Sequence, residues 1–378
     1  MSGVKISMIA GARAAGRRLA DRMTPFIFNE WYVAAHSKEV GRELLHRTLL
    51  GKSVVFFRAK DGTPVALDNR CPHRSYPLSS GTLVDDTVVC GYHGMRFNVD
   101  GDCIDLPAVS PCPRNVGVRR YPVIEKGSYC WIWMGDSAMA DAASIPAPAW
   151  TSSSDWLGGD GYFHMKGSYV SLHENLLDTS HLSFIHAKSI GSPDYVKAPI
   201  TTEIHPGRFA LNRLMYPTKL PESLATLTGL RGDADVARAV RNEFLSPAYY
   251  EATTRIYDTR LNESGRKEFV IRVAHMPTPE SLTSTHYFIQ VARNFAHDDD
   301  ASRHAMVTHL LSAFEEDVVA LELQENMQRA AGEELFELSF PSDELTLAMR
   351  HYLKSRADVE RRAASPGLSV VPEGVEEA

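Results

Sequence analysis

Short apolar runs separated by turn residues dominate the first third of the chain. The runs cover residues 53–57, 64–67, 87–89, 121–123 and 129–134. Turn sequences such as Asp61-Gly62 and Asp100-Gly101 lie between them, and apolar runs of this length between turns are typical of strands in a small sheet. We therefore expect an all-β domain over residues 25–135.

The apolar runs of the second half are longer, and a helical period appears among them. The pattern predicts strands around residues 162–165, 249–257, 268–275 and 285–291. It also predicts a helix over residues 171–180, and the stretch 301–331, rich in Leu, Glu, Ala and Gln, predicts a helix of about eight turns. The sequence between the first helix and residue 249 reads as irregular. These elements predict a second domain over residues 156–354 and an α+β fold for the chain.

Three further segments lack such patterns. Residues 136–155 contain Ala, Ser and Pro with few large apolar side chains, so we expect a linker there. Residues 1–24 are rich in Arg and nearly free of acids, and we interpret them as an N-terminal extension, with Met23 as an alternative start. Residues 355–378 are charged and then rich in Pro, Gly and Glu, which predicts a flexible tail.

Composition and charge exclude several classes of function. The 378 residues are 44% hydrophobic and carry a formal net charge of −7, which argues against a nucleic-acid partner because phosphate binding needs a basic surface. No apolar run reaches the length of a membrane span. With only five cysteines, two of them in the motif below, the thiols are expected to be reduced and the protein cytoplasmic.

The first candidate chemical site combines Cys71-Pro72-His73 with Cys90-Gly91-Tyr92-His93. Each half supplies one thiolate and one imidazole from a tight loop, and two Cys with two His are the ligands of a Rieske [2Fe–2S] cluster. A zinc site is the nearest alternative, but structural zinc ligands are usually spaced with two Cys in one half and two His in the other. The spacing therefore favours the cluster.

A second candidate site follows residue 175. His181 and His186 lie five residues apart, and Asp178 lies three residues before His181, which would place Asp178 and His181 on one helical face. Two His and one carboxylate form the facial triad of non-haem Fe(II) oxygenases, which leaves positions open for O2. Asp178 is the nearest carboxylate, but the helix over residues 301–331 could deliver a distant one. Periodicity does not choose among Glu315, Glu316 and Asp317.

Other histidines are less informative. His173 would lie about 12 Å from His181 along a continuous helix, so we interpret it as structural or pocket-lining. A structural or pocket-lining role is also the default reading of the remaining candidates, His164, His205, His275 and His309.

With both motifs, the chain resembles the oxygenase component of Rieske non-haem iron oxygenases from about residue 23 to residue 331. The matching motifs are C-P-H-R, C-G-Y-H-G and N-x-x-D-x-x-H-x4-H, the last beginning at Asn175. The resemblance implies the following ligand sets: Cys71, His73, Cys90 and His93 for the cluster, and His181, His186 and Asp317 for mononuclear Fe(II).

The resemblance also implies an architecture and an assembly. The second domain should adopt a helix-grip (START-like) fold, in which a curved antiparallel sheet wraps a long helix. Asp178, which we count with Asn175 among the catalytic residues, should bridge His181 to His93 of a neighbouring subunit in a head-to-tail homotrimer. No Gly-rich dinucleotide motif occurs, so NAD(P)H is expected to act only through a separate reductase or ferredoxin.

Residues 277–280 and 284–288 resemble the branch of vanillate O-demethylases and dicamba monooxygenase. That branch implies an aromatic monooxygenase that uses O2 to hydroxylate an O-methyl group of a small aromatic compound, releasing formaldehyde. A ring-hydroxylating or angular dioxygenase and an N-dealkylase remain alternatives within the family. A Rieske electron carrier fused to a ligand-binding domain is the alternative of another class. His286 and Asn294 would share one strand face and contact an anionic aromatic substrate, with core packing as the alternative role.

Overall fold

The computed structural model describes residues 26–107, 116–146, 148–230, 235–260, 268–297, 300–331 and 337–364. The expected N-terminal extension and the last residues of the expected tail lie outside these ranges. None of the described helices is both long and apolar enough to cross a lipid bilayer.

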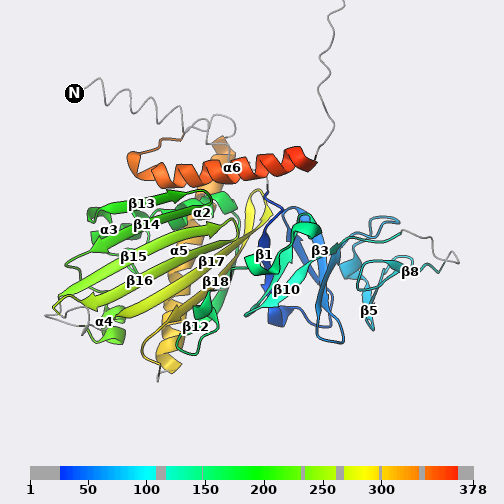
Figure 1. The fold of residues 1–378 in the computed structure, drawn as a ribbon, viewed down its shortest axis with the longest axis horizontal. Helices are drawn as coiled ribbons and strands as arrows, with labels where there is room; N and C mark the ends of the chain where they lie inside the picture. Colours follow the sequence, from blue (N-terminus) through cyan, green and yellow to red (C-terminus); the bar gives the residue numbers. More distant parts are fainter. Residues whose placement is uncertain are drawn as a thin grey trace, which may run out of the picture.

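The N-terminal domain consists of three small antiparallel sheets (Figure 1). One has the strand order β1-β11-β10, another β2-β3-β4-β9, and the third β5-β6-β7-β8. The strands are β1 (Trp31–His36), β2 (Leu45–Leu49), β3 (Lys52–Arg58), β4 (Pro64–Asp68), β5 (Thr82–Val84), β6 (Thr87–Val89), β7 (Arg96–Phe97), β8 (Cys103–Asp105), β9 (Arg120–Tyr121), β10 (Val123–Lys126) and β11 (Tyr129–Trp133).

The apolar run 54–57 is continuous because strand β3 lies between two cores. Val54 and Phe56 pack into a cluster with residues of β1 and β11. Val55 and Phe57, on the opposite face of the strand, pack into a second cluster that contains Cys71 and Cys90. A strand buried on both faces has no polar alternation, and here its second face supports the loops that carry the two cysteines.

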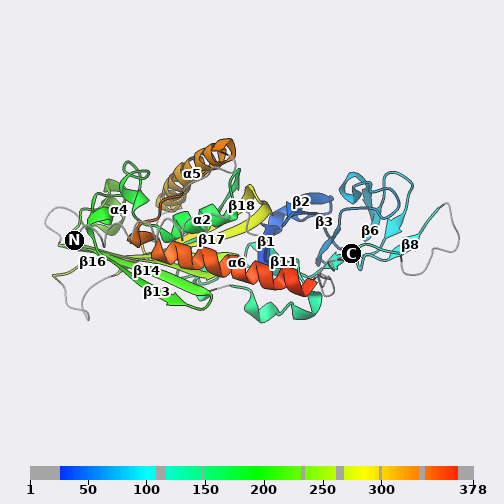
Figure 2. The same ribbon diagram turned by 90° about the horizontal axis from the view of Figure 1, so that it is seen from above.

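The second domain is built on a seven-stranded antiparallel sheet in the order β12-β18-β17-β16-β15-β14-β13. Its strands are β12 (Leu157–Met165), β13 (Ile200–His205), β14 (Arg208–Met215), β15 (Val236–Ser246), β16 (Tyr249–Asp258), β17 (Phe269–Ser281) and β18 (Ser284–Arg293). The α-helices are α2 (Tyr169–Leu177), α3 (Asp194–Lys197), α4 (Glu222–Thr228), α5 (Asp300–Ala331) and α6 (Glu344–Ala364). Helices α2 and α5 lie on one face of the sheet (Figures 1 and 2), as the helix-grip expectation requires.

Close packing fixes where the long helix α5 crosses strand β12. A Cβ atom added at Gly161 would lie 2.2 Å from Cδ2 of Leu311, so a larger residue there would displace this leucine side chain. Helix α2 begins at an N-cap, where the Ser168 side chain accepts a hydrogen bond from the Val170 N–H. It ends at Leu177, earlier than the expected residue 180.

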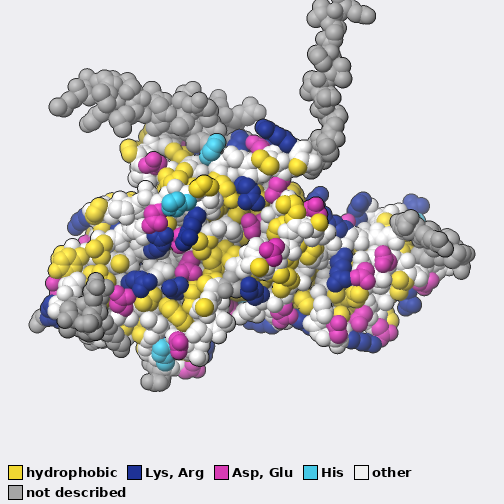
Figure 3. Space-filling model, viewed as in Figure 1, with side chains coloured by type: hydrophobic (Ala, Val, Ile, Leu, Met, Phe, Trp, Pro, Cys, Tyr) yellow, Lys and Arg dark blue, Asp and Glu magenta, His cyan; other side chains and the backbone are white. Residues whose placement is uncertain are grey.

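The reading of the sequence before residue 249 as irregular was wrong, because β13, β14 and β15 form there. Their outer face carries ion pairs, such as the one between Arg241 and Glu203 at 2.6 Å. In the space-filling view, basic and acidic side chains lie side by side over these strands (Figure 3). The inner face of β15 includes the polar side chains Arg238 and Asn242. Polar residues on both faces of β15 removed its period-2 signal.

Two segments expected to be loose are packed. The expected tail from residue 355 is helical as far as Ala364, and Ala357 is buried against the sheet domain. The backbone N–H of Phe28 donates to Glu360 Oε2 at 2.6 Å, so α6 also holds the start of the N-terminal domain. In the expected linker, Ile145 and Trp150 are buried, and the Trp150 indole N–H donates to Glu251 at 2.9 Å.

Candidate metal centres

The two loops with Cys and His have the same hydrogen-bond pattern. The Cys71 N–H donates to the carbonyl of Tyr76, five residues on, and the Cys71 carbonyl accepts from Ser75. Cys90 repeats this, donating to Met95 and accepting from Gly94. Ser75 and Gly94 both have a positive φ, of 57° and 75°. The two loops are therefore equivalent turns that present their side chains in the same way.

The side chains of the two loops meet in an arrangement that suits a [2Fe–2S] cluster. Cys71 and Cys90 are 2% exposed, and burial raises the pKa of the Cys71 thiol. The rings of His73 and His93 lie with centroids 4.6 Å apart, and both residues are exposed. Two buried thiols below two exposed imidazoles are the donor set of a cluster in which one iron binds two cysteines and the other iron binds two histidines.

The second centre brings His181, His186 and Asp317 together. Nε2 of His186 lies 3.0 Å from Asp317 Oδ1, and Nε2 of His181 lies 3.4 Å from the same oxygen. One ligand atom from each of the three residues lies within 4.8 Å of the others. Two imidazoles and one carboxylate at this separation, largely buried, fit a mononuclear iron with open positions.

Charge and neighbouring side chains hold this group together. Burial alone would raise the pKa of Asp317, but contacts with His181 and His186 hold it well below its ordinary value. Burial opposes protonation of His181, yet Asp178 and Asp317 raise its pKa to about 9. Nδ1 of His186 lies 2.7 Å from Glu316, and the Asn175 amide donates to Asp317 at 3.1 Å. Such outer contacts orient metal ligands and set their tautomers.

The spacing predicted that Asp178 and His181 would share one helical face, and this was wrong. Asp178 does lie beside His181. It is the C-cap of α2, and His181 begins the separate 3-10 helix His181–Ser183. Asp178 Oδ2 lies 3.8 Å from His181 Nδ1, and its other oxygen accepts from the Ser180 N–H at 2.6 Å. The side chain is 47% exposed, so it connects the buried ligand to the surface.

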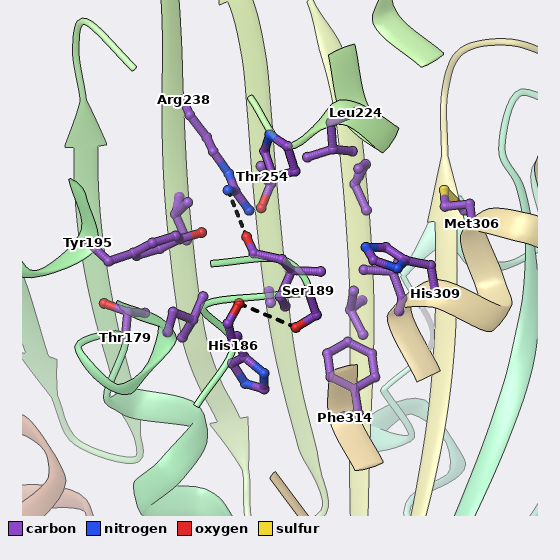
Figure 4. Close-up of a pocket in the computed structure, with 18 of the residues that line it drawn as sticks. Thr179, His186, Ser189, Tyr195, Leu224, Arg238, Thr254, Met306, His309 and Phe314 are labelled. Carbon is purple, nitrogen blue, oxygen red and sulfur yellow. Dashed lines mark hydrogen bonds between the residues drawn. The ribbon is translucent and has the colours of Figure 1, made fainter. Parts of the chain in front are cut away.

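A cavity of about 360 Å³ opens from this centre into the second domain. It lies between the inner face of the sheet and helices α4 and α5, with His186 at one side and Phe314 and Met306 on α5 (Figure 4). Most of its wall is apolar, including Leu224, Val273 and Leu310. A largely apolar cavity next to a candidate metal site is the usual form of a small-molecule site.

The cavity contains polar residues to which the sequence assigned no specific role. His275 and His309, expected to be structural or pocket-lining, both line it, and so does Arg238. Burial lowers the pKa of His275 to about 3, so its imidazole is neutral. The alternation Ile271, Val273, His275 was the available signal, because residues two apart face the same side of a strand.

His286 and Asn294, the expected substrate contacts, do not line this cavity. His286 lies at the boundary between the domains, where Nδ1 is 2.9 Å from the Tyr162 hydroxyl and Nε2 is 3.0 Å from the carbonyl of Thr48. Asn294 follows the end of β18, and its side chain accepts from the Val270 N–H. The prediction that His286 and Asn294 share one face of a strand was wrong, because β18 ends at Arg293, before Asn294.

The two centres lie far apart within one chain. The loops with Cys71 and Cys90 are at the outer end of the N-terminal domain, near β5 and β8, whereas α5 runs through the other domain (Figures 1 and 2). Strands β1 and β10 lie between them (Figure 1). The first centre, with its two exposed histidines, is therefore separated from the second centre of the same chain.

Two family models match the chain. One describes the Rieske [2Fe-2S] domain and matches residues 30–122, and the other describes the vanillate O-demethylase oxygenase C-terminal domain and matches residues 165–358. The first covers both Cys-His loops. The second covers more than half of the chain and contains His181, His186 and Asp317.

Similar proteins and structures span most of the chain. The iron-sulfur subunit of a toluene-4-sulfonate monooxygenase system from Comamonas testosteroni is 34% identical over 310 residues, which are 80% of this chain and 89% of that protein. The oxygenase component of dicamba O-demethylase from Stenotrophomonas maltophilia is 32% identical over 278 residues, 72% of this chain and 80% of that protein. The crystal structure of dicamba monooxygenase bound to dicamba covers 89% of this chain and 99% of its own, with a TM-score of 0.80 and 26% identity. These matches confirm the expected two-domain α+β fold.

Proposed function

Because this chain belongs to the Rieske non-haem iron oxygenases, in the group of the vanillate O-demethylase oxygenase components, we propose that it oxidatively demethylates a small aromatic ether. Its cofactors are a Rieske [2Fe–2S] cluster and a mononuclear iron, and proteins of this kind are oxygenase components of multicomponent systems. The observation that carries the proposal is the convergence of His181, His186 and Asp317 beside an apolar cavity.

The proposal assigns a role to each ligand. Cys71, Cys90, His73 and His93 hold the cluster, and His181, His186 and Asp317 hold the iron. When bound, the cluster transfers single electrons from a separate reductase or ferredoxin, and the iron supplies O2 activation.

The remaining residues prepare the site for this chemistry. Glu316 at His186 Nδ1, 2.7 Å away, fixes the ring so that Nε2 faces the metal position. Asn175 holds Asp317 through one oxygen. The apolar wall from α5 and β17 would limit the access of water, and the cavity beside it would let a methoxy group approach the three ligands.

The net reaction balances with two electrons and two protons. One oxygen atom of O2 is inserted into a methyl C–H bond, and the other is reduced to water. The resulting hemiacetal loses formaldehyde, and the ring oxygen keeps the electron pair of the broken C–O bond and gains a proton as a phenol. NAD(P)H serves only as the reductant of the partner protein.

Electron transfer is proposed to occur between chains. The distance between the centres of one chain and the exposure of His73 and His93 support a head-to-tail homotrimer, in which each cluster serves the iron of a neighbour. Asp178, half exposed beside His181, is suited to accept a hydrogen bond from such a histidine. It is proposed as the bridge between the two centres.

The test is the product of turnover with a surrogate reductase. Methoxylated aromatics should yield one formaldehyde per phenol formed, and oxygen-18 from O2 should appear in formaldehyde under conditions that limit its exchange with water. Asp317→Ala should retain the visible absorbance of the cluster, lose the iron in excess of the cluster and lose turnover. If wild-type protein holds only cluster iron and sulfide, the oxygenase proposal fails and an electron carrier remains.

A second candidate is hydroxylation of a methyl group attached directly to the ring. The similarity to toluene-4-sulfonate monooxygenase subunits, which covers 80% of this chain, favours it. The same cavity and metal ligands would serve, but the product would be a benzylic alcohol without formaldehyde. Methyl-substituted and methoxy-substituted rings, compared side by side, separate the two. A cis-diol product would point to ring dihydroxylation, and aldehyde from N-alkyl substrates to N-dealkylation.

A further inference from the structure

Arg238 is a charged side chain inside the apolar cavity. It lies on strand β15, is 6% exposed, and lines the cavity together with Val240 and Asn242, the next residues on the same strand face. Figure 4 shows its side chain reaching into the cavity between Tyr195 and Thr254, across from the loop that carries His186.

The guanidinium has few interactions for a buried charge. One Nη donates to the carbonyl of Ile190 at 3.1 Å, and the group lies 5.1 Å from the centre of the Tyr195 ring. Its Nε is buried without a hydrogen-bond partner. No carboxylate among the described residues forms an ion pair with Arg238.

Neither of the two carboxylates that line the cavity forms an ion pair with Arg238. Asp317 faces the two histidines, and Glu222 is exposed. A buried guanidinium without an anion is costly, because the charge has lost water and gained no opposite charge. Arginine also binds planar or tetrahedral oxyanions through several N–H groups at once. The cavity therefore lacks the anion that Arg238 is placed to bind.

We propose that Arg238 binds an acidic group on the substrate, a carboxylate or a sulfonate, so that the enzyme acts on aromatic acids and not on neutral aromatics. This inference rests on the proposed function, because it places the reacting methyl group at the metal ligands and the acid at the Tyr195 side of the cavity. Arg238 is thus a specificity-determining residue, and its role is to orient the ring.

A purely structural role for Arg238 makes a different prediction. Its bond to the Ile190 carbonyl ties down the segment that follows His186. If this were its only role, replacement would loosen a metal ligand, lower the iron content and impair acidic and neutral substrates alike.

The experiment compares matched acidic and neutral ligands in binding. The probes are the three methoxybenzoates and 4-methoxybenzenesulfonate, each paired with its carboxamide or sulfonamide. Dissociation constants are measured by calorimetry on the anaerobic holoenzyme without reductase, so that turnover is not required. The proteins are the parent, Arg238→Gln, Arg238→Lys and Arg241→Gln. Arg241 is on the same strand, but it lies on the outer face with Glu203.

We expect the parent to bind at least one acid more tightly than its neutral counterpart. Arg238→Gln should weaken the binding of that acid by about ten- to a hundredfold, because a charge-assisted contact is lost. The binding of the neutral ligand should weaken by less than about threefold. Arg238→Lys should retain part of the preference, and Arg241→Gln all of it. Iron content should stay unchanged in each variant. Preference for the sulfonate or for a benzoate identifies which acid fits.

Equal binding of acids and amides by the parent, or no binding of any acid at millimolar concentration, overturns the inference. So does an equal loss of both in Arg238→Gln together with loss of iron. The proposed function is judged separately: formaldehyde release from neutral ethers alone would sustain it while overturning the role of Arg238. Arg238-dependent binding without formaldehyde would do the reverse.

Discussion

At the scale of single residues, His186 has a carboxylate near each ring nitrogen. This explains why periodicity alone did not identify the acidic metal ligand. Glu316 approaches Nδ1 at 2.7 Å and Asp317 approaches Nε2 at 3.0 Å. Adjacent acids on α5 thus both serve the same histidine, so helical periodicity could not choose between them. The Cys-His loops were predictable because each holds its ligands within a few residues, where local hydrogen bonds determine the geometry.

The substitution Asp178→Asn tests the proposed role of a single residue in electron transfer. In Asp178→Asn the side-chain shape and the contact with the Ser180 N–H are kept, but the negative charge beside His181 is lost. We expect unchanged cluster and iron content, with turnover lowered by about a hundredfold or more. Stopped-flow reoxidation of the pre-reduced cluster, in the presence of substrate and O2, measures the effect. Unimpaired reoxidation would remove Asp178 from the electron path.

At the scale of elements, the sequence predicted the helices and strands that have a regular pattern of apolar and polar residues. Helix α5 and strands β16 to β18 were expected near their observed positions. Strand β15 was missed because it carries an ion pair on one face and the polar cavity residues Arg238 and Asn242 on the other. The extent of α6 was missed because its contacts are with residues far away in the sequence, such as Phe28. Local composition does not report such contacts.

The contact of α6 with the N-terminal domain predicts a pH dependence of stability. Burial raises the pKa of Glu30 to about 7, although Arg356 on α6 opposes the shift. A carboxyl with a raised pKa binds a proton more readily in the folded state. It therefore favours folding below the ordinary pKa, and this contribution is lost as pH rises from about 4.5 to about 7.

Glu30→Gln removes this titration. At pH 8 the variant should be more stable than the parent by on the order of 1 kcal/mol, and the difference should shrink at pH 5.5. Guanidinium unfolding at both pH values measures it. Glu43→Gln, at an exposed position, is the control and should show no such change with pH. A variant that gains nothing at pH 8 contradicts the burial of a charged Glu30.

At the scale of the whole molecule, the two centres of one chain lie in different domains, and the proposed head-to-tail assembly would join the centres of neighbouring chains. The trimer was expected only from the family resemblance, because composition and periodicity contain no signal for an interface between copies, and it stays a prediction. The structure adds the exposed His73 and His93 at one end and the exposed carboxylate of Asp178 in the other domain. A head-to-tail arrangement would bring these two surfaces together.

Complementation between inactive chains tests this assembly. His93→Ala should lack a working cluster and Asp317→Ala should lack the iron, so each is inactive alone. When they are co-expressed in equal amounts, about a quarter of the junctions in a head-to-tail ring should pair an intact cluster with an intact iron site. Product formation per protein should approach about that fraction of the parent rate. No activity above the separate variants would place electron transfer within one chain.

The exposure of His73 and His93 at one end of the chain has a consequence for dilute protein if the proposed ring forms. Dilution that separates the subunits should then lower the rate per chain, while each separated chain keeps its cluster and its iron.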